Sequence, residues 1–467
     1  GNRNTTEWGN WTNSFRWNHV YNQKLFSNLT AYSSSFTNIN NNDFTLKKYR
    51  WKSDILELGL KLDFTHFVNN KNTLKYGAAL SHKQFNPGII ELVDSTNAFS
   101  DYASQYTRNY ELNLYISNEQ EISDKVSLQY GLRYTFFADV GPYNQYSYKN
   151  NQGNFIDTNI YIPPNQLKDA FHSLEPRLAV RYLLNDFSSL KTSITYNQQN
   201  LHLLSNSSVG LPYDIWITAS NLVKPQTSWQ YTIGYYANFL KNKLNFSAEI
   251  YYKDLNNIID FKDNANLFLN KYIEQSILPG IGRSYGLELF LEKNGKKFSG
   301  WISYTYGDTK YKINGVNGNR WFSPRYDIRH NLSIVAVYKV SKRFEFSSTF
   351  KITSGGFISF PTRSFRFDDA IFVVYDGRNN YQLPTYHRLD VAFRVRSKNY
   401  EKQKLKKEWF FSIYNLYGQE NIFALNVRPD IGNLGGIDLG RNQTSSNKAY
   451  YTYLFGIVPT ITFSMKF

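Results

Sequence analysis

The residues best suited to binding a ligand are aromatic and basic side chains in segments that lack a regular hydrophobic period. They are Trp216, Arg320, Trp321, Arg363 and Arg366, and Asp368 and Asp369 follow Arg366 directly in the same segment. Aromatic faces stack on sugars, and arginine forks bind carboxylates bidentately. We therefore expect ligand contacts with a sugar, a peptide or an anionic chelate. A simpler interpretation is an interfacial girdle, because Trp and Tyr gather where a chain leaves a membrane.

Residues capable of covalent chemistry are present, but their spacing does not favour it. The seven histidines are scattered and include no HExxH pair. Ser323, Asp327 and His330 are close in sequence, without a recognisable oxyanion device. Residues 280–286 read GIGRSYG, one residue off the dinucleotide fingerprint, and no helix is expected after them. We predict no enzyme activity, catalytic residue, metal or cofactor, although spacing alone leaves an outer-membrane protease or lipase open.

The composition indicates how the chain is built. It has 467 residues, 38 Tyr, 35 Phe and no Cys, with a net charge of +16. The absence of Cys excludes disulfides and thiolate metal sites. No apolar run is long enough for a transmembrane helix. Many Lys and Arg fall in short turns, which favours solvent or anionic lipid headgroups over nucleic acid.

The elements expected to position these residues are strands, because the hydrophobic period is two. From 54 to 67, leucines and Phe64 alternate with Glu57, Lys61 and Asp63. At the end of the chain, 450–467 alternates in the same way and predicts one long final strand. Apolar residues on one face suit lipid, and charges such as Glu249 on the other face must line a wet or plugged lumen.

Short and long connections alternate strictly along the chain. The short turns lie near 21–24, 68–72, 122–125, 185–188, 240–243, 293–297, 340–343 and 397–407. The long connections lie near 39–53, 86–107, 138–170, 200–226, 255–282, 309–325, 354–385 and 418–449. This arrangement is typical of an outer-membrane barrel with periplasmic turns and extracellular loops.

The strand count gives a second expectation. Eight hairpins and a final strand predict an all-β, antiparallel, up-and-down transmembrane barrel of about seventeen strands in one domain, 1–467. Bacterial barrels have an even strand number, with both ends in the periplasm. An odd count with residue 1 outside therefore predicts at least one further strand upstream.

Several blocks resemble TonB-dependent receptors. They are Leu211–Phe261, Gly280–Thr309 (GIGRSYGLELFLEKNGKKFSGWISYTYGDT), Arg320–Phe350 (RWFSPRYDIRHNLSIVAVYKVSKRFEFSSTF) and Tyr381–Val395 (YQLPTYHRLDVAFRV). The resemblance implies a barrel of about twenty-two strands around an N-terminal plug, so that five strands and the plug would lie upstream. The aromatic end, Phe467 with Phe463 on the same face, is similar to the family's membrane assembly signal.

The resemblance implies a function that composition alone does not. It implies an integral protein of the bacterial outer membrane that binds and imports a scarce nutrient: an iron chelate, cobalamin, a glycan or a peptide. The implied partners are outer-membrane lipid and lipopolysaccharide, the TonB energy-coupling complex acting through the plug, and a lipoprotein or larger complex. The alternative is a structural or interaction subunit of a larger outer-membrane assembly. A passive porin fits the odd strand count poorly.

Overall fold

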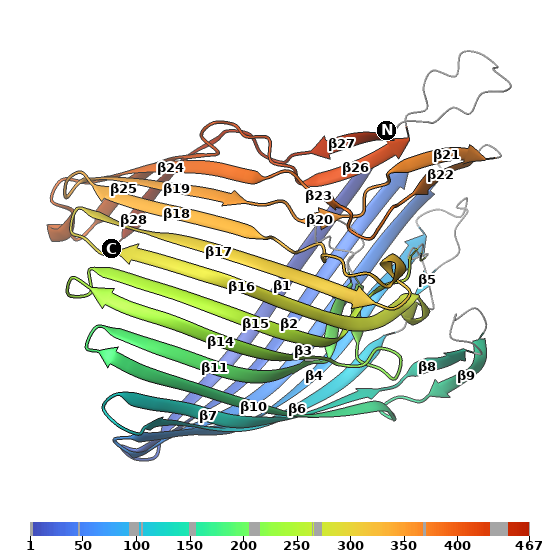
Figure 1. Ribbon diagram of the computed structural model, residues 1–467, viewed down its shortest axis with the longest axis horizontal. Helices are drawn as coiled ribbons and strands as arrows, with labels where there is room; N and C mark the ends of the chain where they lie inside the picture. The colour runs from blue at the N-terminus through green and yellow to red at the C-terminus, as the bar shows by residue number, and fades with distance from the viewer. Residues whose placement is uncertain are drawn as a thin grey trace.

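A single antiparallel sheet forms almost the whole structure, a computed structural model (Figure 1). It describes residues 3–44, 47–92, 102–103, 106–148, 156–204, 215–263, 265, 273–367, 370–429 and 447–466. Within these residues the sheet has 18 strands, of which β5 (Tyr102–Ala103) is a two-residue addition to β4. The remaining seventeen match the number predicted from the turns.

The wall strands follow one another in chain order, each paired with the next. They are β1 (Arg3–Val20), β2 (Leu25–Phe44), β3 (Lys47–Asn69), β4 (Asn72–Leu92), β6 (Thr107–Glu121), β7 (Val126–Val140), β10 (Leu167–Asn185), β11 (Ser188–Gln199), β14 (Gln226–Phe239), β15 (Leu244–Phe261), β16 (Ile277–Lys293), β17 (Phe298–Ile313), β18 (His330–Lys339), β19 (Phe344–Thr353), β24 (Tyr386–Arg396), β25 (Lys406–Tyr414) and β28 (Val458–Lys466). In Figure 1 the sheet curves round, so that β1–β4 lie behind β14–β17.

The long connections carry small elements at one end of the wall, opposite the short turns (Figure 1). The hairpins are β8 (Tyr143–Tyr148) with β9 (Ile156–Ile162), β12 (Leu201–Leu204) with β13 (Ile215–Thr218), β20 (Phe357–Ile358) with β23 (Tyr381–Gln382), β21 (Arg363–Phe367) with β22 (Ala370–Val374), and β26 (Ala424–Pro429) with β27 (Asn447–Thr452). Two 3₁₀ turns, η1 (Ile273–Ser276) and η2 (Asn317–Asn319), also lie in the long connections, whereas η3 (Tyr400–Lys402) lies in the short turn between β24 and β25. We call the two ends of the wall the loop end and the turn end.

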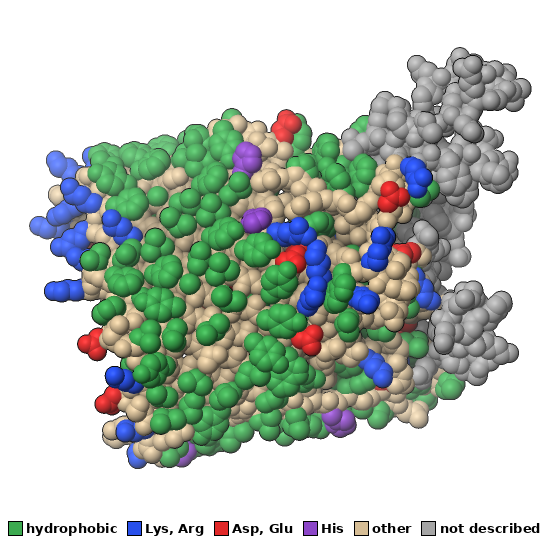
Figure 2. All heavy atoms as spheres, viewed as in Figure 1, with side chains coloured by type: hydrophobic (Ala, Val, Ile, Leu, Met, Phe, Trp, Pro, Cys, Tyr) green, Lys and Arg blue, Asp and Glu red, His purple; other side chains and the backbone are tan. Residues whose placement is uncertain are grey.

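The two faces of the wall differ as the alternation predicts. Leu60 of β3 lies opposite Leu80 of β4, which lies opposite Leu112 of β6, and Leu60 and Leu80 are exposed. Glu57 and Glu111 belong to the opposite parity, on the concave face. Figure 2 shows hydrophobic side chains across most of one outer face. Among the described residues, no helix is both long and apolar enough to span a membrane.

Most of the described buried apolar residues lie at the loop end. One cluster joins Leu204, Ile217, Val223, Phe261 and Ile277, from five segments. A second cluster is formed by Ile258, Tyr311, Ile313, Val316 and Phe322. These clusters pack the first residues of the loops against the ends of β15, β16 and β17, so the loop bases are held to the wall by burial of apolar surface.

Both edges of the sheet are free in the described part of the chain. There β1 pairs only with β2, and β28 pairs only with β25. A free edge leaves a row of unpaired backbone donors and acceptors, which a membrane interior does not tolerate.

The prediction of one long final strand over 450–467 is wrong. The segment divides into β27, which ends at Thr452, and β28, which begins at Val458. β27 pairs with β26, whereas β28 pairs with β25, and β25 ends at Tyr414. Asn415 follows in the left-handed region with φ 55°, and its Nδ2 donates to Gln419 O at 2.9 Å. No β25 residue therefore lies opposite the stretch between β27 and β28.

Two predicted loops are instead largely strand. β2 and β3 remain paired from Asn38↔Ser53 to Phe44↔Lys47, which covers most of the connection expected at 39–53. β4 likewise runs to Leu92, into the connection expected at 86–107. Asn-rich sequence reads as loop, yet an antiparallel partner satisfies its backbone groups whatever the side chain.

Candidate functional site

A charged cavity of about 890 Å³ lies at the loop end of the wall. The ends of β15 and β22 and the segments 317–325 and 375–378 contribute to its lining. Its charged residues are Lys262, Asp263, Arg320, Arg325, Asp376 and Arg378. Among the described lining residues, four cations stand against two carboxylates, and a third carboxylate, Asp260, pairs with Arg378 from behind the lining. Four cations and three carboxylates leave a net charge of about +1, which favours an anionic guest.

Arg378 ties the cavity's parts together. Its Nη2 donates to Asp260 Oδ1 at 2.5 Å and to Phe261 O at 3.0 Å, and its Nε donates to Asp260 Oδ2 at 3.3 Å. Its backbone N–H donates to Asn317 Oδ1 at 3.0 Å. The forked guanidinium thus fixes the segment after β22 to the end of β15 with a two-pronged ion pair, the strongest geometry available to Arg.

Asn317 and Asn379 complete the frame. The Asn317 N–H donates to Asp263 Oδ2 at 3.0 Å. Asn379 is buried, and its Nδ2 donates to Ser323 O at 2.8 Å. Both residues have positive φ, 52° and 49°, a conformation that Asn tolerates better than most residues. These turns hold 317–325 and 375–380 side by side around the cavity.

Of the five predicted ligand residues, one lines this cavity and a second pairs with a lining residue. Arg320 lines it directly. Arg363, on β21, reaches it through Asp376, a lining residue whose Oδ1 lies 3.5 Å from Arg363 Nη2. A role for either residue in ligand binding stays a prediction.

The other predicted residues lie elsewhere. Trp216 is on β13, opposite Leu203 of β12. The Trp321 ring stacks under the guanidinium of Arg283, 4.6 Å from its carbon, at the outer wall. Arg366 is on β21, and its side chain, like Asp368, Asp369 and Phe467, lies outside what the structure describes. Phe463, on β28, packs against Trp409 with ring centroids 4.6 Å apart.

Sequence reasoning missed Arg378, Asp260 and Asp263. Arg378 and Asp260 are 118 residues apart, so no local pattern could pair them. The only local signal is the Asp376–Gly377 dipeptide, which marks a turn. A Cβ on Gly377 would come within 2.9 Å of Asn317 Oδ1, so this turn needs glycine for close approach.

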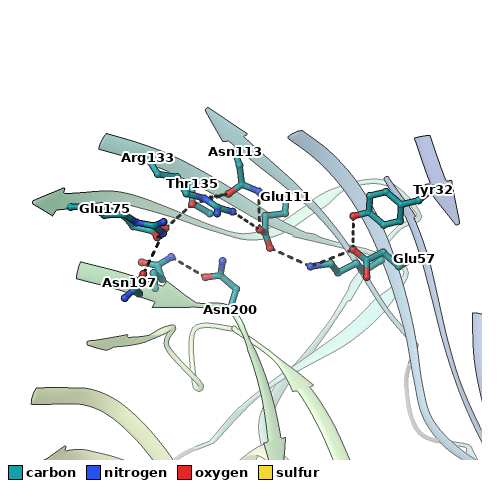
Figure 3. Close-up of polar contacts among 12 residues, drawn as sticks. Tyr32, Glu57, Glu111, Asn113, Arg133, Thr135, Glu175, Asn197 and Asn200 are labelled. Atoms are coloured by element: carbon teal, nitrogen blue, oxygen red, sulfur yellow. Dashed lines mark hydrogen bonds and ion pairs between the residues drawn. The ribbon is translucent and has the colours of Figure 1, made fainter. Parts of the chain in front are cut away.

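A second polar feature runs along the concave face (Figure 3). We call it the inner-wall network; its members are Tyr32, Glu57, Lys83, Glu111, Asn113, Arg133, Thr135, Glu175, Arg177 and Asn197. Tyr32 donates to Glu57 at 2.9 Å, and Lys83 lies between Glu57 and Glu111 at 4.0 and 3.5 Å.

The network continues across further strands. Arg133 Nε donates to Asn113 Oδ1 at 3.0 Å, and Thr135 donates to Glu175 at 2.7 Å. Arg177 then lies 3.9 Å from Glu175. The contacts cross from β2 to β11, so the predicted lumen charges are largely balanced by one another, and this face can present hydrogen-bonding groups to water or to a polar solute.

Two ionisable groups in the loops have shifted pKa values. His202 of β12 is buried, and burial lowers its pKa to about 4. Glu274 of η1 is half-buried, and desolvation raises its pKa; Ser220 Oγ donates to it at 3.2 Å. Both shifts follow from desolvation, which disfavours the charged form of each group.

Ser323, Asp327 and His330 are not arranged as a triad in the described structure: Ser323 hydrogen-bonds to Asp327, and no described hydrogen bond links either of them to the His330 ring. The His330 ring Nδ1 pairs with Tyr304 Oη at 2.9 Å, and Ser323 Oγ also accepts from Lys310 Nζ at 2.7 Å. Asp327 Oδ1 accepts from the backbone of Thr309 at 3.0 Å. The part of the chain that is described also holds no cluster of three metal-ligating side chains.

Comparison with solved structures shows the fold. The siderophore receptor PiuA from Acinetobacter baumannii superposes with a TM-score of 0.63 at 14% identity, covering 99% of this chain and 65% of that structure. The ferric yersiniabactin uptake receptor FyuA from Yersinia pestis gives 0.62 at 12% identity, with 100% and 62% covered. The ferric-catecholate import receptor Fiu from E. coli gives 0.61 at 12%, with 89% and 61% covered. The chain therefore spans about three fifths of the length of these structures.

Sequence comparison identifies the family. A search of curated proteins gave no match. The family model described as "TonB dependent receptor-like, beta-barrel" matches residues 1–416, most of the chain. That family consists of outer-membrane β-barrels, and its match agrees with the antiparallel wall, the apolar outer face and the polar inner face. The chain belongs to the TonB-dependent receptor β-barrel family.

Proposed function

We propose that this chain is the wall of an outer-membrane receptor that captures an anionic metal chelate, foremost a ferric chelate, and imports it with energy supplied through TonB. The observation that carries the proposal is the loop-end cavity with its four cations and, with Asp260, three carboxylates. A ferric chelate of net negative charge suits this balance, and Arg320, which the sequence predicts as a ligand residue, is one of the lining arginines. Cobalamin, a glycan or a peptide fits the net charge less well.

The inner-wall network supports transport. A polar concave face, with its charges already paired, offers a solute hydrogen bonds without binding it tightly. The solved relatives named above are receptors for siderophores or ferric chelates by their own descriptions, which agrees with the proposed substrate class.

The free edges of β1 and β28 support closure by further strands that pair with both edges. In the proposed receptor those strands and a plug domain complete the pore, and the plug carries the contact with TonB. The localisation follows: an integral protein of the bacterial outer membrane.

Growth tests the proposal. A strain that lacks the gene is grown with ferric chelates as its only iron source, and the wild-type gene or an Arg320→Gln variant is restored. We expect slow growth on at least one anionic chelate, rescue by the wild type, and rescue by the variant only at raised chelate concentration. Equal growth on every chelate with and without the gene, together with co-purification of the protein in a stable assembly, would favour the structural-subunit alternative.

A further inference from the structure

Exposed cations crowd one sector of the turn end. Figure 2 shows Lys and Arg close together along one part of this rim, and cations mixed with Asp and Glu along another part. Twelve exposed Lys and Arg side chains lie in four consecutive turns: two in 241–243, three in 293–297, three in 339–343 and four in 398–407. We call these twelve side chains the basic crescent. Among the described residues of these four turns, Glu401 is the one exposed carboxylate.

The first four turns of the wall are balanced in charge. Their exposed charged residues are three cations and three carboxylates, namely Lys24, Lys71, Lys125, Glu121, Asp124 and Asp186. The exposed turn charges therefore cancel between β1 and β11, whereas twelve cations against one carboxylate leave +11 between β14 and β25. A basic character common to all short turns does not explain this difference, because both sets lie at the same end of the wall.

The described part of the chain does not neutralise the crescent. The carboxylates on the adjoining strands, Glu345 and Glu408, pair instead with Arg394 at 3.0 Å and with Arg396 at 3.7 Å. Among the described residues, no cation of the crescent has a carboxylate within ion-pair distance. Twelve like charges on one rim repel one another, and an anionic partner relieves that repulsion.

Hydrogen bonds hold the turns of the crescent in a fixed shape. Arg343 Nε donates to Arg396 O at 2.8 Å, and the Arg396 N–H donates to Arg343 O at 2.9 Å, so two neighbouring turns are joined. In the longest turn, Ser397 Oγ donates to Gln403 Oε1 at 2.6 Å, and Gln403 Nε2 donates to Lys398 O at 2.9 Å. A surface that is already ordered loses less entropy when a partner binds.

The extent of the crescent fits one face of a protein better than a lipid leaflet. A leaflet surrounds the wall on every side, so attraction to its headgroups favours cations on every turn, and four turns are balanced. The crescent spans the eight wall strands from β14 to β25. At about 4.8 Å for each strand, this is about 34 Å across. A protein interface of standard size buries about 800 Å² on each partner, which is a patch roughly 30 Å across.

We propose that the basic crescent is a docking surface for a periplasmic protein that presents an acidic face to it. The short turns of outer-membrane barrels face the periplasm, so this partner approaches from inside the cell envelope. Its carboxylates pair with the cations of the rim, which speeds association at low salt and weakens binding as salt rises. The inference depends on the orientation of the wall in the membrane and not on the chelate.

The first test measures where a polyanion binds on the full chain in detergent, with fluorescein-labelled poly-glutamate of about 20 residues as the probe. The crescent variant replaces one exposed lysine in each of three turns: Lys296→Gln, Lys342→Gln and Lys402→Gln. An exposed ion pair contributes roughly threefold in affinity, so we expect about 30-fold weaker binding.

The matched control removes the same charge from three balanced turns, with Lys24→Gln, Lys71→Gln and Lys125→Gln. It should bind the probe within about threefold of the wild type. Equal losses in the two variants would mean that the whole rim attracts the polyanion, and this would overturn the proposal. Unchanged binding in the crescent variant would overturn it as well.

Photo-cross-linking in living cells then identifies what the crescent contacts. The photoreactive residue p-benzoylphenylalanine replaces Asn294 in the crescent or, as the control, Asn70 in a balanced turn; both are exposed. We expect position 294 to give an adduct with a protein whose cross-linked surface, identified by mass spectrometry, is acidic, and the adduct should fall about tenfold in the crescent variant. No adduct, an adduct with peptidoglycan or phospholipid alone, or a protein adduct equally strong from position 70 or in the crescent variant overturns the proposal. Neither experiment depends on chelate uptake, so failure of transport and failure of this surface are distinguishable.

Discussion

The ion pair between Arg378 and Asp260 should control the order of the loop that lines the charged cavity. The perturbation is Arg378→Met, which keeps the aliphatic stem and removes the fork. It deletes three donor contacts, to both Asp260 oxygens and to Phe261 O. It also leaves Asp260 without its main partner in a partly buried place, since the two side chains are only 14% and 22% exposed.

The magnitude follows from that burial. Removing one partner of a buried ion pair costs 3–5 kcal/mol, and this partly exposed pair belongs at the lower end, about 3 kcal/mol. That free energy raises the equilibrium for local opening of the loop roughly 150-fold. The wall strands should not change, because their pairing does not depend on Arg378.

Hydrogen exchange measured by mass spectrometry tests this prediction, since it reports local opening directly. The peptides that cover 357–382 should exchange faster by about two orders of magnitude, while those from β15 to β17 keep their protection. Arg363→Met is the matched control in the same loop. Its pair with Asp376 is 75% and 57% exposed, and such surface pairs contribute 0–1 kcal/mol.

Two outcomes would refute the reasoning. If Arg378→Met accelerated exchange no more than Arg363→Met, the ion pair would not hold the loop. If the wall strands lost protection as strongly as the loop, the pair would serve the stability of the whole sheet and not the cavity.

Three further predictions concern other parts of the molecule. Lys168 Nζ lies 3.1 Å from Asp139 Oδ2, and the two side chains are only 3% and 1% exposed. Lys168→Met should therefore destabilise the loop end by about 3 kcal/mol and lower the melting midpoint of the folded barrel, measured by its migration on gels. An unchanged midpoint would contradict this prediction. His202 has a pKa of about 4, below its unfolded value near 6.5, so the stability that its neutral form contributes above pH 6.5 is lost as the pH falls toward 4, by about 3 kcal/mol in total. Protease cleavage at the β12–β13 hairpin should therefore rise over that pH range in the wild type and stay constant in His202→Gln. Identical cleavage profiles in the two proteins would contradict this prediction. Phe463→Ala should reduce the amount of barrel assembled in the outer membrane several-fold, whereas Thr462→Ala on the other face should not, and equal yields would remove Phe463 from the assembly signal.

The wall could be read from the sequence because burial on one face imposes a period of two. The alternation over 54–67 predicts the exposed face of Leu58 and Leu60 and the inward direction of Glu57, and the structure confirms both. The turns could be read as well, because each short polar break must reverse the chain. The resemblance to TonB-dependent receptors independently predicts the same antiparallel wall.

The residues at which strands end could not be predicted from the alternation of apolar and polar side chains. The Asn-rich segment 39–44 continues as strand because β3 continues opposite it. The residues after Thr452 leave the sheet because β25 has already ended. Whether a polar segment is strand or loop depends on its partner, and the partner is not encoded locally.

Only some of the residues of the charged cavity could be predicted from the sequence. Arg320 was identified by its residue type, but its neighbours Asp263 and Arg378 come from other loops. Trp321 shows the converse limit: its type suggested a ligand platform, whereas the structure places its ring under Arg283 at the outer wall. Residue type indicates what a side chain can bind, and register decides which way it points.

The central claim is that this chain forms the wall of an energised importer, and uptake of iron-55 tests it most directly. Cells with and without the gene are given an anionic ferric chelate, in the presence and absence of a protonophore. The account predicts saturable uptake that requires both the gene and the proton gradient. Uptake that rises linearly with chelate concentration and is unaffected by the protonophore, or that is equal in both strains for every chelate, would contradict it.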